Sequence, residues 1–112
     1  VGKAANIYQA PAAIVVCANK TKAWKRPFDG KITTDIDASI LTDHMMLEAT
    51  ELGLGSVWIC YFNPDILKEA LNLPENLEPV NILALGYSDE LDASAERHKD
   101  MRIGMDELVS YL

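Results

Sequence analysis

The chain has 112 residues and a mass of 12.4 kDa, and its composition of 49% hydrophobic and 24% charged residues excludes a solvated, disordered chain. Seventeen acidic and ten basic side chains give a formal net charge of −7, which argues against a nucleic acid or an anionic membrane as the partner. No apolar run approaches the roughly 20 residues of a membrane span and no secretory signal pattern is present, so we expect one cytoplasmic domain over residues 1–112 with a radius of gyration near ~13 Å.

The first predicted element is a strand over residues 12–18, a β-branched apolar run that follows Pro11 and is typical of burial on both faces. Residues 19–34 are polar and follow neither a helical nor a strand period, which predicts a surface loop. Residues 1–31 also contain six of the ten basic side chains and a single acid, Asp29. Such a basic block is usually a solvated face. Its members are Lys3, Lys20, Lys22, Lys25, Arg26 and Lys31.

Residues 35–52 have a helical pattern, with Asp35 and Asp37 suited to the positive N-terminal end and Gly53 suited to the left-handed position after the helix. At 100° per residue the apolar positions fall on two opposite faces. One face consists of Ala38, Leu41, Met45, Ala49 and Leu52, and the other of Ile36, Ile40 and Leu47. Because both faces require cover, we expect the sheet on one side and a second subunit on the other.

Two more strands and a short helix follow. Residues 56–62 are β-branched and aromatic, Asn63-Pro64 is a helix start with Asn at the N-cap, Pro74 ends that helix, and residues 80–85 form a last strand before Gly86. The alternation of strand and helix predicts one layered sheet. The tail from Leu91 onward is charged and only weakly amphipathic.

Several chemistries lack their motifs. The two cysteines, Cys17 and Cys60, have no zinc-ligand spacing and are interpreted as buried thiols, and His44 is interpreted as a packing or interface residue. Residues 53–56, Gly-Leu-Gly-Ser, follow a helix and precede a strand, the reverse of the order in a dinucleotide-binding turn, so they predict a helix stop and a turn. No metal site and no catalytic acid or base is predicted.

Four segments in order resemble one known family. They are D-A-S-I with L-x-A-T-E-L-G-L-G-S-V-W-I-C-Y-F within residues 37–62, L-K-E-A-L-N-L-P-E at 67–75, P-V-N-I-L-A-L-G-Y at 79–87, and R-H-K-D-M-R-I-G-M-D-E-L-V at 97–109. Together they resemble the C-terminal part of the nitroreductase family of FMN-dependent oxidoreductases. The resemblance runs from about Ala10 to the end of the chain.

The resemblance implies an α+β fold, a nitroreductase-like three-layer sandwich with a central, mostly antiparallel sheet. The family's N-terminal segment, with an arginine-rich motif for the FMN phosphate, has no counterpart here, so we expect a version of the fold that is truncated at its N-terminus. The resemblance also implies an intertwined homodimer through the 35–52 helix, with FMN at the interface. Reduced nicotinamide (NADH or NADPH) would deliver hydride to flavin N5, and a small acceptor such as a nitroaromatic or a quinone would then take its place.

Site residues follow from the same resemblance. Trp58, Ile59, Cys60 and Tyr61 match the stretch whose backbone borders the flavin, with the N–H of Cys60 or Tyr61 bonded to N5. Several relatives have Glu-Gly at the last two positions, so the donor is left open between them. Arg97 and Arg102 are both candidates for holding the FMN phosphate, a task that suits the bidentate guanidinium group.

Two alternatives remain at this stage. The chain could be a non-catalytic fold fragment or dimerisation module that has lost FMN binding. It could also keep the flavin and perform another reaction, since dehalogenases and flavin-fragmenting enzymes share this fold. The physiological acceptor and the preference between NADH and NADPH are not predicted.

Overall fold

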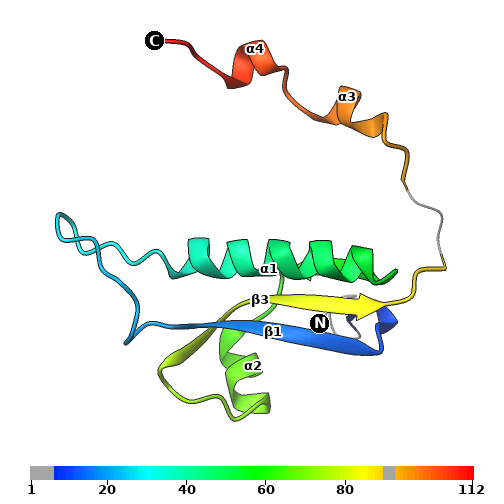
Figure 1. Cartoon of the computed structure of the whole chain (residues 1–112). Helices are drawn as coiled ribbons and strands as arrows, with labels where there is room; N and C mark the ends of the chain where they lie inside the picture. Colours follow the sequence, from blue (N-terminus) through cyan, green and yellow to red (C-terminus); the bar gives the residue numbers. More distant parts are fainter. Residues whose placement is uncertain (1–6, 90–92) are drawn as a thin grey trace.

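The computed structural model describes residues 7–89 and 93–112, in which a three-stranded sheet lies between two helices (Figure 1). The elements in chain order are β1 (Ala12–Asn19), α1 (Thr34–Glu51), β2 (Gly55–Ile59), α2 (Pro64–Ala70), β3 (Leu77–Gly86), α3 (Arg97–Met101) and α4 (Met105–Leu108). α1 covers one face of the sheet and α2 lies against the other (Figure 1). The expected α+β arrangement with an antiparallel sheet is confirmed.

β3 is the central strand, and it pairs antiparallel with both β1 and β2. β1 and β2 therefore run in the same direction, and they end at the same edge of the sheet. The pairing of β2 stops at Ile59, opposite Ile82, whereas β1 continues along β3 as far as Leu77. This edge thus carries the end of β2, the end of β1 and the start of α1.

Local signals begin α2 and end α1 where the sequence predicts, whereas β2 ends at Ile59 rather than at Phe62 and α2 ends at Ala70, before Pro74. The Asn63 side chain accepts hydrogen bonds from the backbone N–H groups of Asp65 (3.0 Å) and Ile66 (3.2 Å), so it caps α2. Gly53 follows α1 with φ of +74°, a conformation that glycine adopts without steric cost. Pro79 sits in β3 next to a shift in register, between the pairs Val16–Asn81 and Cys17–Pro79, and beyond the part of β3 that β2 reaches. A residue without an N–H is tolerated at such a position.

A buried polar pair joins α1 to β3. Thr42 and Asn81 are both 0% exposed. The Asn81 amide nitrogen donates to the Thr42 hydroxyl at 3.0 Å, and that hydroxyl donates to the Ala38 carbonyl at 2.8 Å. Because a hydroxyl has one proton, these two bonds use its donor and one of its acceptor sites. No buried polar side-chain atom in the described part of the chain lacks a partner.

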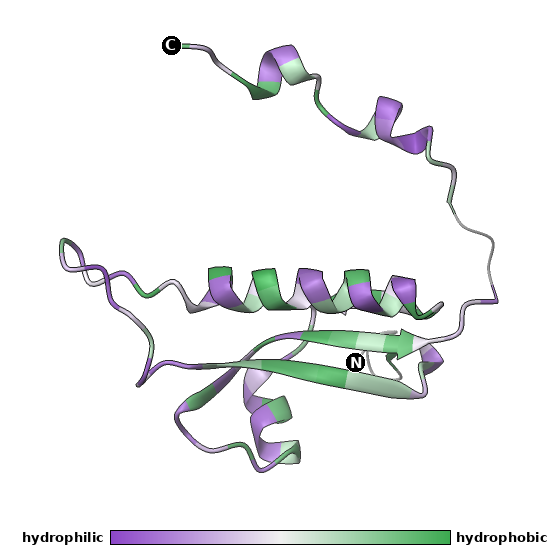
Figure 2. Ribbon diagram, in the orientation of Figure 1, coloured by the Kyte–Doolittle hydropathy of each residue, from purple (hydrophilic) through white to green (hydrophobic). Residues whose placement is uncertain are grey.

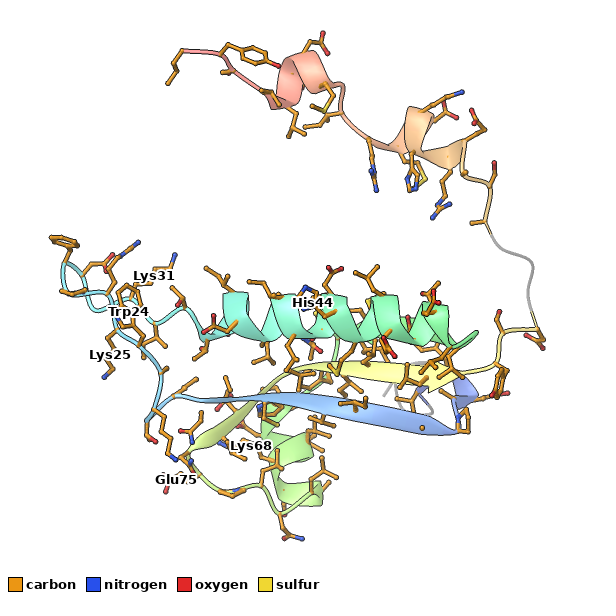
Figure 3. All side chains as sticks on the ribbon, viewed as in Figure 1. Trp24, Lys25, Lys31, His44, Lys68 and Glu75 are labelled. Atoms are coloured by element: carbon orange, nitrogen blue, oxygen red, sulfur yellow. The ribbon has the colours of Figure 1, made fainter. Side chains whose placement is uncertain are left out.

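The opposite face of the sheet packs on α2. Ile59, Ile82 and Ala84 form its buried centre, and Val15 of β1 and Leu67 of α2 pack against them. Lys68 of α2 lies 3.4 Å from both the Glu75 carbonyl oxygen and the Glu78 carboxylate (Figure 3). A single, partly exposed ion pair of this kind contributes little, so burial of the apolar residues is the main force holding α2 in place.

Two burial predictions were wrong. In α1 the buried residues are Ala38, Thr42 and Ala49, while Leu41 and Leu52 are more than half exposed. The helix is turned so that the Thr42 hydroxyl meets Asn81, and the two leucines move off the inner face. β1 is buried only toward its end, at Val16 and Ala18, because its first residues lie beyond the cover of the helices.

The radius of gyration is 17.3 Å rather than the expected ~13 Å. The tail that contains α3 and α4 stands apart from the sheet in Figure 1, and neither helix has a buried residue. Leu91, where the charged tail was expected to begin, lies outside the described residues. Within residues 7–89 and 93–112 no helix is long and apolar enough to cross a membrane, and the cytoplasmic location stays a prediction.

We expect Thr42→Val to destabilise the chain by about 1–3 kcal/mol, because the Asn81 amide would lose its partner inside the protein. Urea unfolding followed by circular dichroism measures the change. Thr50→Val is the matched control, since the exposed Thr50 hydroxyl bonds the Met46 carbonyl at 2.9 Å on the same helix. Adding Asn81→Leu to Thr42→Val should cost less than the sum of the single changes. Equal losses in the Thr42 and Thr50 variants would contradict this role for the buried pair.

Candidate functional site

The end of β2 is the first part of the candidate site. Ile59 is buried in the core beneath α2, and Trp58 is half-buried opposite Leu83. Since Asn81 of β3 faces α1, Leu83 and its partner Trp58 face α1 as well. Thus the two residues anchor the strand on both sides. They hold the position at which the chain leaves the sheet.

Cys60 and Tyr61 lie past the last pair of the β2–β3 ladder. Both are exposed, and Tyr61 keeps 86% of its surface free. The prediction that Cys60 is a buried thiol was wrong, because the strand pairing ends one residue before it. Peptide groups and a flat ring at an open strand end have the chemistry to border a planar heterocycle.

Arg97 and Arg102 lie at the two ends of α3, and the second part of the candidate site is this basic segment. The Arg97 guanidinium donates to the backbone carbonyls of Ala93 (3.1 Å) and Ser94 (2.8 Å). Arg102 first, then loss of hydration and last Arg97 lower the pKa of His98 below its ordinary value, since nearby cations and desolvation both disfavour the imidazolium form. Both guanidinium groups therefore act on one position. Such a cluster suits a phosphate group.

The two parts of the site are not brought together within one chain. α3 is separated from the sheet and from the end of β2 in Figure 1. In kind, the residues fit FMN, because an uncharged strand end suits the ring and a cation cluster suits the phosphate. In position they do not, because a single copy of the chain does not bring the end of β2 and the α3 arginines to the same FMN molecule.

The remaining sequence predictions concern His44, the cysteines and the glycine turn. His44 is exposed on α1 (Figure 3), so it is not a packing residue within this chain. Cys17 is partly buried, and that burial, with the Glu78 carboxylate, raises the pKa of its thiol. Residues 53–55 form the turn between α1 and β2, as predicted. Across residues 7–89 and 93–112 there is no group of three His, Cys, Asp or Glu side chains arranged for a metal ion.

Sequence reasoning missed a cavity of about 270 Å³ between β1, α1 and the segment that joins them. Its polar lining includes Asn19, Lys22, Thr34 and Asp37, and its apolar lining includes Val16, Ala38 and Leu41. These residues come from three segments that a local pattern does not connect. Only the basic bias of residues 20–31 pointed to this region.

Comparisons with known proteins agree with the fold. The family described as the nitroreductase family matches residues 1–87, which leaves the basic segment of α3 outside the match. A nitroreductase family protein of Clostridium difficile 630 has a solved structure with 63% identity and a TM-score of 0.89, covering 95% of this chain and 62% of that one. A structure described as an FMN-dependent nitroreductase of Clostridium difficile R20291 has 31% identity and a TM-score of 0.65, covering 84% of this chain and 57% of that one.

A curated protein of Archaeoglobus fulgidus, named provisionally as an NADH dehydrogenase/NAD(P)H nitroreductase, is 40% identical over 88 residues. The match covers 74% of this chain and 48% of that protein. The chain thus spans about half the length of this curated relative and about three-fifths of the two solved ones.

We expect Arg102→Gln to raise the pKa of His98 toward its ordinary value, because the larger of the two cationic influences is removed. A bound phosphate should also raise this pKa, since an anion favours the imidazolium form. By reciprocity, phosphate should bind more tightly as the pH falls through the His98 pKa. Proton NMR titration of the imidazole signals measures both effects, with His44→Gln to assign the signals. An unchanged His98 pKa in Arg102→Gln would contradict the cluster.

Proposed function

The chain belongs to the nitroreductase family, and from that premise we propose that it is the part of an FMN-dependent oxidoreductase that carries the ring-binding strand and a phosphate-binding segment. The observation that carries the proposal is the exposed end of β2, held by Trp58 and Ile59, in a chain of this family. A solved relative described as FMN-dependent supports the choice of cofactor. Curated relatives named for NAD(P)H support reduced nicotinamide as the substrate.

In this proposal Trp58, Ile59, Cys60 and Tyr61 border the ring system, and the backbone N–H of Cys60 or Tyr61 is the donor to N5. Arg97 and Arg102 hold the phosphate through charge-assisted hydrogen bonds. When bound, FMN would supply the redox chemistry that transfers hydride from reduced nicotinamide to a small acceptor such as a nitroaromatic or a quinone. The residues themselves bind and orient, and none is assigned as an acid or a base.

We propose that the functional unit is a homodimer through α1. Ile36, Ile40 and Leu47 are between 53% and 63% exposed, and they form a second apolar face on the side away from the sheet (Figure 2). An apolar stripe along an 18-residue helix indicates a covering partner. A second copy also fits the site, because one chain does not present the end of β2 and the α3 arginines to the same molecule.

The alternative function is a fold fragment or dimerisation module without a cofactor. The separation of α3 from the sheet favours it, since the phosphate cluster then has no ring site beside it. Flavin binding distinguishes the two, because only the first proposal requires it.

We expect the purified protein to bind FMN, and Arg97→Gln with Arg102→Gln to weaken this binding roughly 10- to 100-fold, the range for lost hydrogen bonds to a charged group. Equilibrium dialysis with visible absorbance measures the affinity. Lys99→Gln is the matched control in the same segment, because its ammonium pairs with Glu96. A protein that stays colourless with excess FMN would support the module instead, and equal losses in all variants would remove the assigned role of the arginines.

We expect a mass of twice 12.4 kDa in light scattering, and a single-chain mass after Ile40→Asp with Leu47→Asp, since two buried carboxylates would oppose association. Ser39→Asp with Thr50→Asp is the control, as Ser39 is partly exposed and Thr50 is exposed on the same helix, and neither belongs to the apolar face. Circular dichroism checks that each variant is folded. If wild type has the mass of one chain, a second copy does not cover α1, and the additional residues of the longer relatives become the alternative cover.

A further inference from the structure

The segment between β1 and α1 is a hydrogen-bonded hairpin rather than an irregular loop. Lys25 and Ile32 form an antiparallel bridge, the Arg26 N–H donates to the Lys31 carbonyl at 2.9 Å, and the Gly30 N–H donates to the Arg26 carbonyl at 2.8 Å. At the tip, Asp29 accepts from the Arg26 guanidinium (Nε–Oδ1 2.8 Å) and from the Lys31 N–H (3.1 Å). The hairpin therefore presents its side chains in a defined arrangement.

The hairpin has an excess of positive charge in a chain of net charge −7. Arg26 pairs with Asp29, and Lys20 lies 3.7 Å from Glu78. In the described part of the chain, Lys22, Lys25 and Lys31 have no carboxylate within ion-pair distance. These three charges are available to an external anion.

The hairpin also exposes flat aromatic surface. Trp24 is 62% exposed and Phe28 is 95% exposed. Since residues two apart on a ladder share a face, the Lys25–Ile32 bridge puts Trp24, Arg26 and Lys31 on one face and Lys25 on the other. Figure 3 shows Lys25 and Lys31 extending to opposite sides of the hairpin. One face thus combines an exposed indole with an unpaired ammonium group.

The base of the hairpin lies where β1 ends, on the α1 side of the sheet. The 270 Å³ cavity at the base of the hairpin is lined by Lys22 from the hairpin side and by Val16 from β1. Val16 pairs with Asn81, and Ile59 pairs with the next residue, Ile82. Because Asn81 faces α1, Val16 lies on the α1 side of the sheet, as does Trp58, whose partner Leu83 is two residues further along β3, whereas Ile59 lies on the α2 side. The cavity at the base of the hairpin and the Trp58 side chain of the candidate ring site are therefore on the same side of the sheet.

We propose that the hairpin binds the phosphorylated adenosine end of the nicotinamide dinucleotide, which would make NADPH the preferred hydride donor over NADH. Trp24 stacks on the adenine, and Lys31 and Lys22 contact the additional phosphate. The assignment to a dinucleotide rests on the proposed function, while binding of an adenosine phosphate at the hairpin does not require flavin. The cavity lining also contains the Asp37 carboxylate, which does not attract an anion. The selectivity for an anion therefore comes from the lysines of the hairpin.

Calorimetric titration with adenosine 2′,5′-bisphosphate and with adenosine 5′-monophosphate tests the site without flavin. We expect the bisphosphate to bind more tightly and its affinity to fall about fivefold in Lys31→Gln, the upper range for an exposed charge pair. Trp24→Ala should lose about tenfold, as expected for a lost stacking surface. Lys25→Gln, on the opposite face, and Phe28→Ala, at the tip, are matched controls that should each change the affinity less than about twofold. Circular dichroism verifies the fold of each variant.

Equal losses in Lys25→Gln and Lys31→Gln would overturn the proposal, since they would indicate only a diffuse positive field. Equal affinities for the two nucleotides, or tighter binding of single-stranded RNA than of the bisphosphate, would also overturn it. In the FMN-loaded protein, Lys31→Gln should lower kcat/KM for NADPH and leave that for NADH unchanged. If the Lys31→Gln enzyme is active and its ratio of kcat/KM for NADPH to that for NADH is unchanged, the hairpin inference is rejected and the proposed oxidoreductase function is not. Bisphosphate binding in a protein that takes up no FMN rejects the proposed oxidoreductase function and keeps the site.

Discussion

The hydrogen bond between Asn81 and Thr42 is the contact on which the orientation of α1 depends. Both side chains are fully buried, and leaving either without its partner costs more than a lost surface contact. A purely apolar helix face could rotate against the sheet with small changes in energy. The polar pair removes that freedom, and the apolar residues on the far side of the helix, Ile36, Ile40 and Leu47, then have to face away from the sheet.

The direction of the strands determines where the remaining features lie. Because β3 runs antiparallel to both of its neighbours, the ends of β1 and β2 and the start of α1 meet at one sheet edge. The exposed end of β2, the cavity and the basic hairpin all occur there. The opposite edge, where β1 begins, instead brings Pro11 against Gly86, at which a Cβ would lie 2.9 Å from the Pro11 ring. Glycine is therefore needed at the close of β3.

The candidate site is divided between two regions with different kinds of support. The end of β2 is held by core residues on both faces of the sheet, and strand pairing ends just before Cys60. The basic segment of α3 has Arg97 and Arg102 at its two ends but no buried residue to hold it against the sheet. A second copy and a flavin would each connect the end of β2 with the basic segment of α3, which a single chain leaves apart.

Local signals in the sequence determined the number and kind of elements in the body, because a cap or a stop acts within a few residues. Asn63 begins α2, Gly53 ends α1 and the β-branched runs form strands, and the order of motifs identified the family. Tertiary structure alone decided the rotation of α1, which is turned by roughly 40° from the face counted from apolar residues. The reason is a hydrogen bond between residues 39 apart in the sequence, which no local pattern contains. Tertiary structure likewise decided the exposure of Cys60 and the hairpin at residues 20–33, which depend on where strand pairing stops. It also decided the separation of the tail, which depends on which surfaces become buried.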